Sequence, residues 1–163
     1  MSQMKDLQAR QEDLRNSLVV GWICALLLIL TMFVVSLVKA AIATDFSRFA
    51  KDPGNIGLNM MIIIFAIHAV IPVALRVFNG VVFRWTMVGG GIFFFLMFLA
   101  HELTHMFVDK MPMNIYHTLD WTHHGLMLWI IAMNILWARA AAPGTARAGN
   151  DVPLTANLAV NAK

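Results

Sequence analysis

The sequence predicts an all-α integral membrane protein: a bundle of four transmembrane helices with a short N-terminal surface helix and a disordered C-terminal tail. Hydrophobic residues make up 60% of the 163 residues and charged residues only 13%, against roughly 45–50% and 25% in soluble domains. A water-soluble domain of this size has too little interior to bury so much apolar surface. The composition therefore excludes a soluble enzyme and a disordered protein.

Four apolar segments define the predicted spans, since a helix needs about 20 residues to cross a bilayer. Leu18–Val38 and Pro53–Leu75 reach this length without a Lys, Arg, Asp or Glu residue. Trp85–Ala100 and Gly125–Ala138 are shorter, and they reach it only by extending toward each other. We therefore expect a membrane domain over residues 18–142, with spans at about residues 18–42, 55–78, 84–108 and 115–139.

The two ends of the chain have a different composition from the membrane domain. Residues 1–17 are polar, with Met4, Leu7 and Leu14 at helical spacing, which predicts an amphipathic surface helix. Residues 143–163 contain Pro, Gly, Asn and Ala without periodicity, which predicts a disordered tail.

The distribution of lysine and arginine predicts the orientation. Of the 12 basic residues, four (Lys39, Arg48, Lys51 and Lys110) fall on one side of the predicted membrane and the other eight on the side of both termini. Because cytoplasmic loops are enriched in Lys and Arg, we expect both termini in the cytoplasm, with the protein in the inner membrane of a bacterium. The scattered basic residues form no block, which excludes a nucleic-acid partner.

Polar residues gather where the third and fourth spans approach their connecting turn on the outer side. They are His101, Glu102, His105, His117, Asp120, His123 and His124. A charged residue at the bilayer centre costs about 2.5–3.5 kcal/mol on insertion scales, so such residues indicate function. His101 and His105 are four residues apart and share a helix face, and so do Glu102 and His105, which are three residues apart. Asp109 extends this row by another turn.

These residues form His-Glu-x-x-His on one helix and Asp-x-x-His-His on its antiparallel neighbour. A carboxylate followed three residues later by histidine, on each of two facing helices, is typical of di-metal sites in helical bundles. We expect all seven residues to be metal ligands, with Glu102 as the candidate catalytic residue and His68 as an outer member. Imidazole and carboxylate together suit iron or zinc, and nearby methionines suit copper, so the sequence does not distinguish these ions.

Two local resemblances point to enzymes. The boxes His101-x3-His105 and His123-His124 resemble those of membrane hydroxylases and desaturases, which implies oxygen activation on a lipid-soluble substrate. The segment 98–105, Phe-Leu-Ala-His-Glu-Leu-Thr-His, looks like the active-site helix of site-2-type intramembrane proteases. That resemblance implies a zinc hydrolase in which His101, His105 and Asp120 bind zinc and Glu102 activates water.

Three further interpretations stay open. A b-type haem could be clamped by His68 with His124, or His101 with His124, in an electron-transfer subunit. The polar residues could instead form a hydrogen-bonded structural or proton-relay cluster. The chain could also be a non-catalytic subunit of a larger membrane complex, with other subunits and the lipid bilayer as its partners. The sequence does not separate an enzyme from a subunit.

Overall fold

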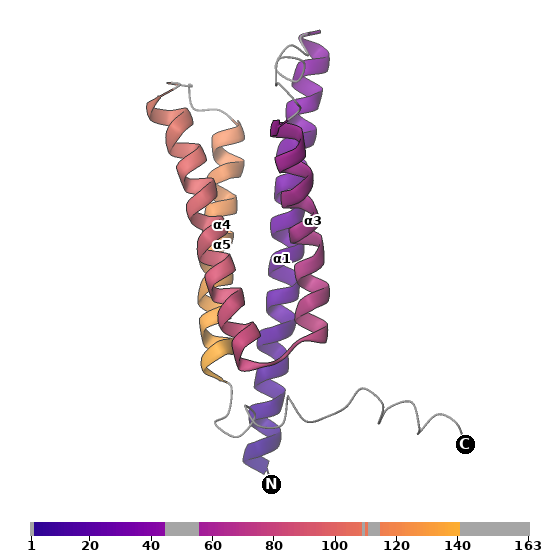
Figure 1. The fold of residues 1–163 in the computed structure, drawn as a ribbon, viewed down its shortest axis with the longest axis vertical. Helices are drawn as coiled ribbons and strands as arrows, with labels where there is room; N and C mark the ends of the chain where they lie inside the picture. The colour runs from indigo at the N-terminus through magenta and orange to yellow at the C-terminus, as the bar shows by residue number, and fades with distance from the viewer. Residues whose placement is uncertain (1, 45–55, 109, 111–114, 141–163) are drawn as a thin grey trace, which may run out of the picture.

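The computed structural model describes residues 2–44, 56–108, 110 and 115–140, and these residues form an all-helical structure (Figure 1). Its four helices are α1 (Ser2–Ile42), α3 (Ile56–Val77), α4 (Val81–Phe107) and α5 (Ile115–Arg139). The spans predicted at about residues 55–78, 84–108 and 115–139 end within three residues of the bounds of α3, α4 and α5. The predicted C-terminal tail, residues 143–163, lies outside the described residues.

Helix α1 is continuous from Ser2 to Ile42 and joins the predicted surface helix to the first predicted span. Its early turns pack on the bundle, because Leu14 lies against the hydrophobic core. The Gln11 side-chain amide donates a hydrogen bond to the carbonyl of Ala140, just after α5. Residues 2–17 therefore extend the bundle and contact the end of α5.

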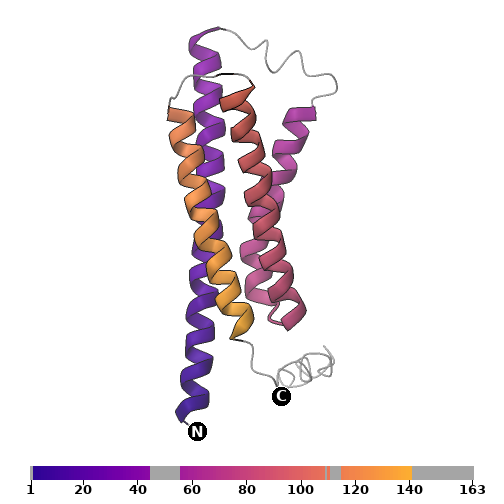
Figure 2. The ribbon, with the colours of Figure 1, turned by 90° about the vertical axis from the view of Figure 1, so that its left-hand side faces the viewer.

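The helices form two antiparallel pairs, α1 with α3 and α4 with α5, which are joined by packing of α1 on α5 (Figures 1 and 2). The beginning of α1, the turn between α3 and α4, and the end of α5 all lie at one end of the bundle (Figure 1). The core between the pairs is built from large apolar side chains, among them Leu18, Trp22, Leu75, Phe94, Met127 and Ile130.

Three of these helices are long and apolar enough to cross a membrane: α1 over Lys5–Ile42, α3 over Asn59–Val77 and α4 over Val81–Phe107. Their outward faces carry exposed side chains such as Leu27, Ile62 and Phe93. Helix α5, the fourth predicted span, has 25 residues but is not among the three. The reason is its first half, where three histidines and Asp120 replace apolar residues.

Close packing of α1 on α5 requires glycine at position 21. A Cβ atom there would lie 2.6 Å from Cζ3 of Trp129 and 3.1 Å from Cγ1 of Ile130.

We expect Gly21→Ala to lower the free energy of unfolding by about 1–3 kcal/mol, the usual cost of overpacking, measured by thermal unfolding in detergent. Gly90→Ala is the matched control, because a Cβ there meets no atom within 4 Å. It should unfold no earlier than the parent, since alanine favours the helix. Equal destabilisation of both variants would contradict this account of the interface.

A buried arginine ties three parts of the chain together at the end of the bundle that holds the start of α1. Arg84 is 2% exposed, and its Nη1 donates to the carbonyl of Trp137 at 2.8 Å. Nη2 donates to Oε1 of Gln11 at 3.2 Å and to Oδ1 of Asn79 at 2.7 Å, and Nε donates to the Asn79 carbonyl at 3.1 Å. The guanidinium carbon also lies 4.7 Å from the Trp137 ring centroid. Arg84 thus links α1, the α3–α4 turn and α5.

Candidate metal centre

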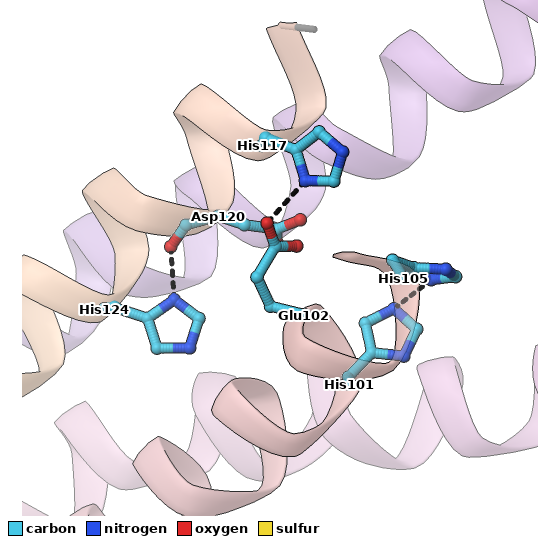
Figure 3. Close-up of polar contacts among 6 residues, drawn as sticks. All are labelled: His101, Glu102, His105, His117, Asp120 and His124. Atoms are coloured by element: carbon cyan, nitrogen blue, oxygen red, sulfur yellow. Dashed lines mark hydrogen bonds and ion pairs between the residues drawn. The ribbon is translucent and has the colours of Figure 1, made fainter. Parts of the chain in front are cut away.

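Glu102 is the residue of α4 that reaches into α5. Its side chain is buried, and Oε1 accepts a hydrogen bond from Nδ1 of His117 at 2.5 Å (Figure 3). Because Nδ1 carries the proton in this bond, the lone pair of the neutral ring lies on Nε2. Nε2 of His117 is buried, and no described residue offers it a hydrogen bond. A carboxylate that orients a histidine in this way is common beside metal ions.

The carboxyl groups of Glu102 and Asp120 lie close together (Figure 3). Oε2 of Glu102 is buried and has no hydrogen-bond partner among the described residues. Asp120 also interacts electrostatically with His117 and His105. The three side chains Glu102, His117 and Asp120 therefore form one polar cluster across the α4–α5 interface, which we call the carboxyl cluster.

His101 and His105 form a separate pair on α4 (Figure 3). Their Nε2 atoms lie 3.1 Å apart and their ring centroids 4.4 Å apart. His101 is exposed and His105 is half-buried. Successive residues of a helix are rotated by about 100° around its axis. Glu102 therefore points to α5, whereas His101 and His105, which are one helical turn apart, lie together on the neighbouring face of α4. The predicted shared face of Glu102 and His105 is therefore split in the structure.

The adjacent histidines of α5 also point in different directions. His124 donates from Nδ1 to the carbonyl of Asp120 at 2.6 Å, and its ring packs against Phe95 and Trp121. His123 is fully buried, and its ring faces Phe98 and His68. His68, which the sequence places deep in the second span, is therefore in contact with α5 through His123.

The structure thus distributes the predicted ligands over three places: the His101–His105 pair, the carboxyl cluster, and the interior around His68 and His123. His124 lies in none of these groups, because it bonds to the Asp120 carbonyl and packs against Phe95 and Trp121. Within the described residues, no group of three or more His, Cys, Asp or Glu side chains is arranged to hold a metal ion. Asp109, the third member of the predicted row on α4, lies outside these residues. The predicted metal centre with all seven ligands in one place is not preformed in the part of the chain that the structure describes.

Two residues that the sequence did not single out border these sites. The ring centroids of Trp22 in α1 and His68 lie 5.4 Å apart. Met127 of α5 is fully buried. The sequence gives little indication of their role, because a tryptophan in a predicted span is usually a membrane anchor and a methionine is usually an apolar packing residue. Met127 does follow His123 by four residues, the spacing that places two side chains on one helix face.

The chain matches no protein-family model, no curated protein sequence and no solved structure.

Proposed function

We propose that the protein is an integral membrane metal protein in which His101 and His105 hold a divalent transition-metal ion beside the carboxyl cluster. The observation that supports this best is the 3.1 Å separation of the two Nε2 atoms. Two imidazoles bound to one ion at 2.0–2.1 Å have their nitrogens about 2.9–3.4 Å apart, for octahedral to tetrahedral angles. The side chains of the pair therefore already lie at the spacing of two ligands of one ion.

The membrane assignment rests on the three apolar helices and their exposed faces. We propose that α5 is the fourth span, because α4 and α1 pack along it and its three histidines are buried against protein. With four spans both termini lie on one side, and the Lys and Arg asymmetry places that side in the cytoplasm. The histidine pair then lies toward the outer surface of the membrane.

Two protein ligands leave coordination positions open for water, oxygen or a substrate, as in catalytic metal sites. The carboxyl cluster lies next to the pair on α4, and it brings the carboxyl groups of Glu102 and Asp120 close together beside those positions. This arrangement suits an iron-type redox or oxygen-activating centre that acts on a lipid-soluble substrate. The same centre could serve a larger membrane complex to which this chain contributes the metal site.

The position of Glu102 argues against a zinc hydrolase. In such an enzyme the glutamate between the two histidines must activate a metal-bound water, whereas here Glu102 is 1% exposed and bonded to His117. We propose that Glu102 positions His117 and is not itself a metal ligand. The metal content of Glu102→Gln should therefore equal that of the parent.

Metal analysis of the purified full-length protein tests the proposal. We expect one ion per chain of a divalent metal in the parent, and a loss of about tenfold or more in His101→Ala and in His105→Ala, because each removes one of two imidazole ligands. His124→Ala is the matched control, since this histidine also lies near the cluster but bonds to a helix carbonyl. The proposal fails if the parent binds no divalent metal, or if the two variants retain it.

A further inference from the structure

The bundle interior holds a second group of nitrogen atoms that the proposed centre does not use. His68 of α3 and His123 of α5 are both 0% exposed. Within the described residues, Nε2 of His68, both ring nitrogens of His123 and Nε1 of Trp22 have no hydrogen-bond partner. Buried polar groups are nearly always paired, so three side chains with unpaired nitrogens in one place point to a ligand.

The spacing of the two imidazole rings matches that of a pair of metal ligands. Their ring centroids lie 6.5 Å apart, with an angle of 47° between the planes. Two imidazoles on opposite sides of one ion have centroids about 6.3 Å apart for metal–nitrogen bonds of about 2.0 Å. Nδ1 of His68 donates to the Ile64 carbonyl at 2.8 Å, which leaves its Nε2 lone pair available. Such a carbonyl bond is typical of histidines that bind metals.

Aromatic rings surround the pair and favour a bare ion over a haem. The Phe98 ring centroid lies 4.5 Å from that of His123 and 6.4 Å from that of His68. Phe98 therefore occupies the flank of the gap between the imidazoles, where a haem macrocycle would have to extend. The ring centroids of Phe94 and Trp22 lie 4.8 Å and 5.4 Å from that of His68. Aromatic faces stabilise a desolvated cation, so these rings suit a small ion.

The donor set selects the ion. Two neutral imidazoles offer no negative charge to offset a divalent ion in an apolar interior, so a monovalent ion is preferred. Met127 is fully buried, lies four residues after His123 on α5, and belongs to the same hydrophobic cluster as Trp22 and Phe94. Thioether sulfur is a soft ligand that selects Cu(I). We propose that His68, His123 and Met127 form an interior site for Cu(I), distinct from the His101–His105 pair.

Titration of the full-length protein with Cu(I), against a coloured Cu(I) chelator under reducing conditions, tests the proposal. We expect one Cu(I) per chain, and affinity lowered by at least about 100-fold in His68→Phe and His123→Phe. Phenylalanine keeps an aromatic ring in the core, so these variants should fold. Met127→Leu should weaken binding by about tenfold and remove the sulfur signal from the copper X-ray absorption spectrum of the bound protein.

Two controls separate this site from the proposed function. His124→Phe changes the neighbouring histidine, and the double variant His101→Ala/His105→Ala removes the pair on α4; both should bind Cu(I) as the parent does. Loss of Cu(I) only in the double variant would overturn the interior site and leave the outer one. A parent whose copper spectrum lacks nitrogen ligands, or whose visible spectrum shows a haem that is lost in His68→Phe, would also overturn it.

Discussion

Replacing Arg84 with alanine should strongly destabilise the bundle at the end that holds the start of α1 and the end of α5. The substitution removes four hydrogen bonds to Asn79, Trp137 and Gln11. Hydrogen bonds to a charged group contribute about 1.5–3 kcal/mol each, offset in part by relief from burying the charge. We expect a net loss of about 3 kcal/mol, seen as a fall in Tm of about 10 °C in detergent.

Arg76→Ala provides the control, because Arg76 is exposed at the end of α3. Its Tm should stay close to that of the parent. The Tm of Arg84→Lys should resemble that of Arg84→Ala, since a lysine ammonium group cannot donate to several acceptors in different directions as the planar guanidinium does. A parent-like Tm for Arg84→Ala would show that the end of α5 is held by other contacts.

Glu102→Ala should give the second large effect. The substitution leaves Nδ1 of His117 without an acceptor inside the α4–α5 interface, and it removes the carboxyl group that lies beside Asp120. Removing one member of a buried ionic or hydrogen-bonded pair costs about 3–5 kcal/mol. We expect low yield and early thermal unfolding of Glu102→Ala in detergent.

Glu102→Gln separates the hydrogen bonds from the size of the side chain. The amide oxygen can accept from His117 while the amide nitrogen donates to Asp120, so this variant should unfold near the parent temperature. Glu12→Ala controls for loss of an acid in general, because the Glu12 side chain is 62% exposed. If Glu102→Ala and Glu12→Ala unfold alike, the carboxyl cluster does not stabilise the interface.

Much of the fold follows from the sequence. The spans predicted at about residues 55–78 and 115–139 agree with α3 and α5 to within one residue at each end. The charge-free window of α5, Gly125–Ala138, covers only its second half, so its beginning followed from the length that a span requires. The continuity of α1 was not predicted, because residues 2–17 read as amphipathic and amphipathic helices usually lie on a surface. Its contact with Ala140 depends on where α5 ends in space, which sequence pattern does not encode.

The sequence identified the polar residues of the candidate site, but it predicted only some of the contacts between them. Helical spacing correctly placed His101 beside His105, because residues four apart share a face. The same reasoning placed Glu102 with His105, whereas packing of α5 draws Glu102 to His117. The pairing of His68 with His123 depends on how deeply α3 and α5 lie in the bundle. That depth is a property of tertiary packing and not of local periodicity.

Anomalous X-ray scattering from crystals of the purified parent protein tests the central claim most directly. Data collected on both sides of the absorption edge of the metal found by elemental analysis locate that ion. The account predicts a peak within about 2.0–2.2 Å of Nε2 of both His101 and His105, with Glu102 still bonded to His117. Crystals that contain the metal but place it away from both histidines would contradict the account.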